Sequence, residues 1–238
     1  MKLDILVMAA HPDDAELACG GTIALHTGKG YSVGVADLTR GELGTRGTAE
    51  IRMNEAAQAA QILKLSCRTN LKLMDGYISN DIASQIDVIK IIRCHQPEIL
   101  IINATEDRHP DHARAAELCM NAQFLSGLAK IKTTYQTHEQ APWRPKSVYH
   151  YIQDTYIKPN VIVDISSHFD IKMQSIMTYK SQFYDPSSEY SNTYISDKKY
   201  LEYIKARAVE MGHAIGVMYG EGFVKANAVG VQTLFHVL

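Results

Sequence analysis

The stretch Leu3-Asp4-Ile5-Leu6-Val7-Met8-Ala9-Ala10 is a short, nearly continuous apolar run, and the polar cluster His11-Pro12-Asp13-Asp14-Ala15-Glu16 follows it directly. Such a run is typical of a strand that is buried on both faces of a parallel sheet. Residues 15–30 then have the pattern of a helix with a Gly-rich end, and residues 31–38 form a second, valine-rich strand. This order predicts a βαβ unit at the start of the chain.

The same alternation continues along the chain. Apolar residues at helical spacing predict helices at residues 49–64 and 81–93, and residues 97–104 repeat the pattern of a buried strand. The second half is less regular: we expect strands at 147–152 and 160–165, helices at 168–183 and 196–218, and loops at 136–145 and 184–193. These elements predict an α/β fold of the Rossmann-like kind, with a mostly parallel doubly wound sheet and helices on both faces. We expect a single domain over residues 1–238.

Composition excludes several classes of protein. The chain has 238 residues and a formal net charge of -2, without the basic stripe of a nucleic-acid binder. No apolar run is long enough to cross a bilayer, and the N-terminal residues lack a signal-peptide cleavage site. Four scattered cysteines, without CxxC spacing, indicate reduced thiols rather than a secreted disulfide framework. We therefore expect a cytoplasmic protein with neither a membrane nor a nucleic acid as partner.

A second polar cluster, Glu106-Asp107-Arg108-His109-Pro110-Asp111-His112, follows the strand predicted at residues 97–104. Each cluster thus comes directly after a buried strand. In an open parallel sheet, ligands bind in the crevice at the carboxyl ends of the strands. If the two strands are neighbours at the point where the strand order reverses, both clusters face one pocket.

The residue types in the two clusters suit a divalent metal. His11, Asp14 and His112 would supply two imidazoles and one carboxylate, and they would leave one coordination position open for water, as in catalytic sites. A metal lowers the pKa of such a water, and Asp13 is the remaining carboxylate that can take its proton. Zinc is the default ion, although two histidines and one carboxylate also describe iron(II) sites, so Fe(II) is the alternative.

Each cluster also has a purely structural interpretation. A His-Pro-Asp sequence often forms a turn, because proline presets φ and aspartate caps the next helix. Asp13 or Asp14 would then be a helix cap in the first cluster, and Asp111 would be one in the second. The combination of two clusters, each at a strand end and each with histidine and aspartate, favours a site.

Together, the two motifs resemble the metal-dependent N-acetylglucosaminyl deacetylase superfamily that contains the PIG-L and LmbE-like proteins. The resemblance extends over essentially the whole chain. Its further segments lie at residues 38–48, 149–152, 180–184 and 219–223. They look like the bacillithiol-biosynthesis branch, whose members deacetylate N-acetylglucosaminyl malate to glucosaminyl malate. Other relatives act on other GlcNAc conjugates or, as amidases, on bacillithiol S-conjugates, and these activities are the alternatives.

The resemblance implies roles for the residues of the motifs. It makes His11, Asp14 and His112 the zinc ligands and Asp13 the general base in hydrolysis of the N-acetyl group. His109 would stabilise the oxyanion when protonated, or donate a proton to the departing amine. Asp111 would orient His109, although a capping role remains an alternative.

Further positions are implied to bind a small amino-sugar substrate. Arg52 would clamp the malate carboxylates, and Asp75 would bind sugar hydroxyls. Arg108 and Arg144 would line the pocket, and either Tyr194 or Tyr200 would reach it. The alternative for Arg52 is a surface charge paired with a nearby glutamate, and the alternative for Asp75 is a place in a Met-Asp-Gly turn.

Three other interpretations of the sequence are disfavoured. Gly20-Gly21-Thr22 suggests a phosphate cradle, but it lacks the full glycine pattern and lies inside a predicted helix. The absence of GxGxxG after the first strand disfavours a dinucleotide-binding protein, and the intact His and Asp residues disfavour a sugar-binding module that has lost catalysis. The family also implies a homo-oligomer, with a hexamer as one form.

Overall fold

The computed structural model describes residues 1–225, 227–233 and 235 of the chain. Its main sheet has the strand order β3-β2-β1-β4-β7-β9-β8 within these residues. The strands are β1 (Ile5–Ala9), β2 (Val33–Thr39), β3 (Cys67–Leu73), β4 (Ile99–Ile102), β7 (Ser147–Tyr151), β8 (Val161–Asp164) and β9 (Gly220–Val224). A small separate hairpin joins β5 (Thr134–Tyr135) to β6 (His138–Glu139).

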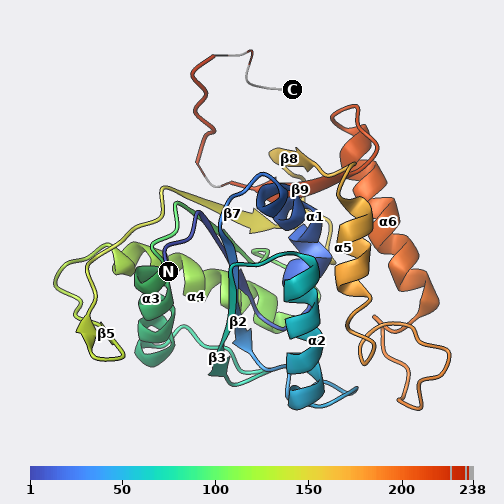
Figure 1. Cartoon of the computed structure of the whole chain (residues 1–238), viewed down its shortest axis with the longest axis horizontal. Coiled ribbons are helices and arrows are strands. Elements are labelled where there is room, and N and C mark those ends of the chain that lie inside the picture. Colours follow the sequence, from blue (N-terminus) through green and yellow to red (C-terminus); the bar gives the residue numbers. More distant parts are fainter. Residues whose placement is uncertain (226, 234, 236–238) are drawn as a thin grey trace.

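Helices cover both faces of the sheet (Figure 1). They are α1 (Asp14–Gly28), α2 (Ala49–Ile62), α3 (Ile82–His95), α4 (Pro110–Ser126), α5 (Phe169–Ile176) and α6 (Lys198–His213). Helices α3 and α4 pack on one face, whereas α1 and α2 lie on the other, where α5 and α6 form a further layer. Among the described residues, no helix has both the length and the apolar character that a membrane span requires.

The sheet is mostly parallel. Strands β3, β2, β1, β4 and β7 pair in parallel, and β9 lies antiparallel between β7 and β8. Strand β1 lies between β2 and β4, with Ile5 opposite both Val33 and Ile99. The strand order therefore reverses at β1 and β4, which confirms the predicted Rossmann-like, doubly wound architecture.

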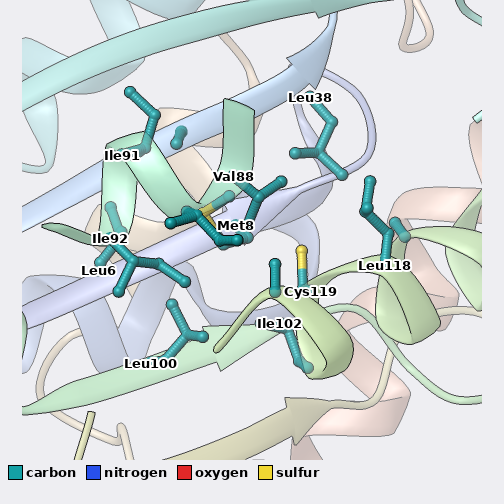
Figure 2. Close-up of a cluster of buried hydrophobic side chains, with 14 of the residues drawn as sticks. Leu6, Met8, Leu38, Val88, Ile91, Ile92, Leu100, Ile102, Leu118 and Cys119 are labelled. Atoms are coloured by element: carbon teal, nitrogen blue, oxygen red, sulfur yellow. The ribbon is translucent and has the colours of Figure 1, made fainter. Parts of the chain in front are cut away.

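The apolar run of β1 is explained by burial on both faces. Leu6 and Met8 point into the layer under α3 and α4, where they pack with Leu100, Val88 and other residues (Figure 2). Ile5 and Val7 point the other way, into the cluster that includes residues of α1. Alternate side chains of a strand face opposite sides, so a strand between two helical layers needs apolar residues at every position.

The helix predicted at residues 168–183 is wrong in length, because α5 ends at Ile176. Beyond that point the chain turns to bind Glu55 of α2. The amide and hydroxyl of Ser181 each donate to the Glu55 carboxylate at 2.7 Å, and the Thr178 hydroxyl donates to the Glu55 carbonyl. These bonds to a distant residue replace the continuation of the helix.

Several other boundaries and elements differ from the prediction, and the β5–β6 hairpin places the short strand β6 within the loop predicted at residues 136–145. Helix α6 covers Lys198–His213 rather than residues 196–218, because the chain folds back at Gly212 and Gly216 to enter β9. Gly216 has φ +76, a conformation that favours glycine. Strands β3 and β9 were not predicted. Strand β3 forms an edge of the sheet, and the polar composition of such edge strands hides them from pattern analysis.

Candidate metal centre and active site

Both polar clusters lie at the carboxyl ends of the neighbouring strands β1 and β4, on the wall of one pocket of about 410 Å³. The lining residues come from both halves of the chain. They are His11, Asp13, Asp14, Leu17, Leu43, Gly44, Thr45, Arg46, Arg52, Asp75, Gly76, Asp107, Arg108, His109, His112, Gln153, Asp154, Gln182, Thr193, Tyr194, Ile195 and Tyr200.

The backbone after β1 turns sharply to present the first cluster. Asp13 has φ 116, a left-handed backbone conformation that residues other than glycine rarely adopt. It precedes α1, and its side chain makes no capping hydrogen bond to the helix. The backbone N–H of His11 donates to Oδ2 of Asp14 at 2.9 Å. Neither aspartate therefore caps α1 in the ordinary way, and the turn instead directs both carboxylates toward the pocket wall.

His112 is oriented by Asp107, a carboxylate for which no role was predicted from the sequence. Its Nδ1 lies 2.6 Å from Oδ2 of Asp107, and its Nε2 lies 3.3 Å from Oδ1 of Asp14. A carboxylate behind a histidine ring in this way fixes the tautomer and leaves the other nitrogen available as a metal ligand. Asp107 thus holds the Nε2 atom of His112 toward Asp14.

His11 is held from the opposite side. Its Nδ1 lies 3.5 Å from Oδ2 of Asp14, and its Nε2 lies 2.9 Å from Oδ1 of Asp75 and 3.4 Å from Oδ2 of Asp111. Oδ2 of Asp75 also accepts the N–H of Leu43 at 2.8 Å. Oδ1 of Asp75 thus supports His11, a contact that was not predicted from the sequence. Asp75 also lines the pocket, and its binding of sugar hydroxyls stays a prediction.

The Asp111 carboxylate makes contacts other than the predicted one with His109. Its carboxylate contacts His11 and accepts the backbone N–H of Gly76 at 2.7 Å. His109 is instead oriented by a backbone group, since its Nδ1 accepts the N–H of Asp111 at 3.2 Å. Burial lowers the pKa of His109, and the neighbouring His11 and His112 lower it further. A neutral ring that accepts at Nδ1 carries its proton on Nε2, so His109 acts as a donor from that atom.

The arrangement of donors fits a divalent cation. Ring nitrogens of His11, His109 and His112 lie within 4.8 Å of one another, and His11 forms a second such group with Asp75 and Asp111. Burial opposes a positive charge on His112, yet the nearby Asp14 and Asp107 raise its pKa to about 9. The carboxylates therefore make this part of the pocket favourable to positive charge, as a metal centre requires.

Asp13 is the carboxylate left beside this centre. Burial raises its pKa to about 7, while Arg52 opposes that shift and Asp14 adds to it. Nη2 of Arg52 lies 2.9 Å from Oδ2 of Asp13 and also donates to the carbonyl of Pro12. Arg52 is buried and pairs with Asp13 rather than with Glu55 or Glu42. A carboxylate with a pKa near neutrality suits a general base.

Arg108 and Tyr194 form the rim of the pocket. Nε of Arg108 lies 3.3 Å from Oδ2 of Asp154, and its guanidinium lies over the Tyr194 ring at 4.4 Å. The Tyr194 hydroxyl donates to Asp154 at 3.2 Å, which closes the cluster. Tyr194 is half exposed and Tyr200 is buried, with their rings 5.4 Å apart. Both tyrosines line the pocket, so the structure brings both to the site.

Arg144 is not at the site, which corrects the expectation that it lines the pocket. Its Nη2 donates to the carbonyl of Phe124 at 2.7 Å, and its guanidinium lies over the Phe124 ring. Phe124 and Gly127, which Arg144 also approaches, belong to the C-terminal end of α4. The pocket lies at the opposite end of this helix, where His109 and His112 are found.

Several pocket residues were missed in the sequence. Gln153, which follows β7, donates from Nε2 to Oδ1 of Asp14 at 2.7 Å. Arg46 and Gln182 reach the wall from two further loops. The sequence contained a sign that Asp107 belongs to the site, because Asp107 lies inside the second cluster. No local sequence pattern pointed to Gln153, since only the pairing of β7 with β4 brings it to the site.

The fold and the site together define an α/β enzyme with a metal-type centre at the switch point of its sheet. Residues 6–123, which contain both clusters, match the family model described as PIG-L, GlcNAc-PI de-N-acetylase. The chain belongs to the PIG-L family of deacetylases, which are hydrolytic enzymes.

Three similar proteins span most of the chain. The crystal structure of the conserved protein TT1542 from Thermus thermophilus is 35% identical, with a TM-score of 0.86, and the match covers 97% of this chain and 98% of that one. Diacetylchitobiose deacetylase of Thermococcus kodakarensis is 26% identical over 98% of this chain and 88% of its own length. A probable N-acetyl-alpha-D-glucosaminyl L-malate deacetylase 2 of Bacillus cereus is 27% identical, and the match covers 76% of this chain and 84% of that protein.

Proposed function

We propose that the chain hydrolyses the N-acetyl group of an N-acetylglucosamine conjugate and releases acetate and the free amino sugar. The observation that carries this proposal is the convergence of His11, Asp14 and His112 beside Asp13 and His109 in one pocket. A metal-donor set, a carboxylate with a pKa near neutrality and a ring N–H donor are the groups that amide hydrolysis needs. The family membership of the chain supports the same activity.

His11, Asp14 and His112 would hold one divalent ion, zinc by default and iron(II) as the alternative. When bound, such an ion polarises the acetyl carbonyl and makes water more acidic. Asp107 and Asp75 keep the two imidazoles turned toward Asp14, and Gln153 steadies the Asp14 carboxylate. The chain thus supplies the ligands and the groups behind them that fix their orientation.

The protein groups divide the proton transfers between them. Asp13 takes a proton from the attacking water, while Arg52 on its Oδ2 keeps the carboxylate in place. His109 donates a hydrogen bond from Nε2 to the oxygen on which negative charge develops. The carbon–nitrogen bond then breaks, the leaving amine takes up the proton that Asp13 received from water, and acetate retains the oxygen that came from water.

The arginines in the pocket bear on the rest of the substrate. Arg52, the predicted carboxylate clamp, is paired with Asp13, and Arg108, which was predicted to line the pocket, is paired with Asp154, so both arginines already have an acidic partner. This pairing favours a neutral aglycone, such as a second sugar, and the similarity to a diacetylchitobiose deacetylase agrees with it. N-acetylglucosaminyl malate, the substrate of bacillithiol biosynthesis, is the second candidate. It is favoured by the half-exposed Arg108, which can exchange Asp154 for a substrate carboxylate.

Acetate release from a panel of substrates tests this proposal. The panel contains diacetylchitobiose and N-acetylglucosaminyl malate, with a bacillithiol S-conjugate assayed separately for release of its free amino sugar, each with and without a chelator. We expect acetate from at least one N-acetylglucosaminide, loss of that activity with the chelator, and recovery when zinc or iron(II) is restored. If the metal-loaded protein releases acetate from neither N-acetylglucosaminide, the proposed function is contradicted.

A further inference from the structure

Helix α1 is interrupted one turn after the active-site loop. Cys19 has φ -140 and ψ 22, which are not helical values, so the helix consists of a first turn, residues 14–18, and a second segment, residues 20–28. In a continuous helix, the N–H of Gly21 would donate to the carbonyl of Leu17. Sharp breaks of this kind usually have a cause, such as a side chain inserted between the two groups.

A buried ion pair from two distant elements fills the break. Nζ of Lys172, in α5, donates to the Leu17 carbonyl at 2.7 Å and to Oε1 of Glu221, in β9, at 2.5 Å. Oε1 of Glu221 accepts the N–H of Gly21 at 2.9 Å, and Oε2 accepts that of Thr22 at 2.6 Å. The pair therefore replaces the missing helical bond. Figure 1 shows α5 and β9 beside α1.

The glycines at the break allow this insertion. A Cβ on Gly20 would lie 3.3 Å from Cγ of Lys172, and one on Gly21 would lie 2.7 Å from Cδ1 of Ile165. The Gly20-Gly21-Thr22 step, which suggested a phosphate cradle in the sequence, thus binds a carboxylate of the protein itself. Glu221 lies at the N-terminus of the second segment and Lys172 at the end of the first turn, where the helix dipole favours each charge.

The role of the pair follows from its position rather than from a contribution to the stability of the protein. The side chains of Lys172 and Glu221 are only 4% and 3% exposed. A buried ion pair is weak evidence for stability, because desolvation of two charges offsets their attraction. The first turn that it holds is short, and it begins at the catalytic loop: the N–H of Leu17 donates to the carbonyl of Asp13 at 2.9 Å. The orientation of Asp13 and Asp14 therefore depends on where Leu17 is held.

We propose that Lys172 and Glu221 are positioning residues for the metal centre. By holding the break in α1 open, they set the direction of the first turn and so place Asp14 between His11 and His112. The inference rests on the proposed function, since it assumes that Asp14 is a metal ligand. It does not require either residue to touch the substrate.

Cobalt(II) titration, followed by visible absorption, tests this role on the full chain. We expect Lys172→Met and Glu221→Gln each to weaken cobalt(II) binding at least about tenfold and to alter the absorption bands, because the first turn reorients. The double variant has no unpaired buried charge, so its Tm should recover relative to the single variants while its metal affinity stays low. A crystal structure of the double variant should show a direct bond from Gly21 to Leu17.

Arg93→Met is the matched control. Arg93 is also a buried cation that donates to backbone carbonyls, those of Ser126, Leu128 and Ile131, but it lies in the layer of α3 and α4. This variant should lose Tm and keep cobalt(II) affinity within about twofold of the wild type.

Unchanged cobalt(II) binding in both single variants, or recovery of affinity in the double variant, would overturn the inference. So would an equal loss of affinity in the Arg93→Met control. A wild-type chain that binds no cobalt(II) would instead overturn the proposed function, and this inference with it.

Discussion

The two walls of the active-site pocket are built differently. One wall consists of His11, Asp13, Asp14, Asp107 and His112, which are mostly buried, and its imidazoles and Asp carboxylates are engaged by groups behind or beside them. The wall formed by Arg108, Asp154 and Tyr194 is more open, with Arg108 and Tyr194 about half exposed. Under the proposed function, we expect the buried wall to perform the chemistry, where fixed geometry is needed, and the exposed wall to select the substrate.

Asp13 on the buried wall should give the largest effect. We expect Asp13→Asn to lower kcat by about 10²–10⁴-fold, the usual contribution of a general base, while the metal content stays near one ion per chain. The measurement is acetate release together with metal analysis. Asp87→Asn, on α3, is the matched control and should leave both quantities unchanged. Loss of metal in parallel with activity would show that residue 13 is a ligand rather than a base.

A group behind the ligands should have a smaller effect. Asp107→Ala removes the carboxylate that orients His112, and we expect metal affinity to fall about 10–100-fold. Asp107→Asn keeps an acceptor for Nδ1 of His112 and should recover part of this loss. Metal affinity measured by competition with a chelator gives the comparison. Equal affinity in all three proteins would mean that His112 needs no support from Asp107.

The exposed wall should give the smallest effect, and one that depends on the substrate. Asp154→Asn leaves the charge of Arg108 without its acidic partner, so kcat/KM for N-acetylglucosaminyl malate should rise a few-fold relative to that for diacetylchitobiose. The change should appear mainly in KM, because no group of the buried wall is altered. A fall in kcat for both substrates alike would instead place Asp154 in the chemical step and remove the distinction between the walls.

The buried wall was also the part that the sequence predicted best. Strand β1, strand β4 and the clusters behind them are local patterns, in which an apolar run is followed at once by His, Pro and Asp. Parallel strands put their carboxyl ends at one edge, so neighbouring strands suffice to bring His11 and His112 together. The contacts of Asp75 and Asp111 with His11 were not predicted, because each depends on how a distant part of the chain packs against the first cluster.

The partners of the arginines were not predicted, for the same reason. Arg52, Arg108 and Arg144 were all expected to meet the substrate, yet each has a partner within the protein that lies far away in the sequence. The end of α5 likewise depends on Glu55, more than 100 residues earlier in the chain. A charged or polar side chain takes whichever partner the fold places beside it, and no local pattern specifies that partner.

What can be read from the chain alone is therefore the buried strands and amphipathic helices of the first half and the chemical nature of the two clusters, because periodicity and strand-end position are local properties. Which carboxylate supports which histidine, which arginine remains available, and how α1 is broken at Cys19 follow from long-range packing. Burial makes these pairings specific, since a buried charge or N–H group must find a partner wherever the assembled layers provide one.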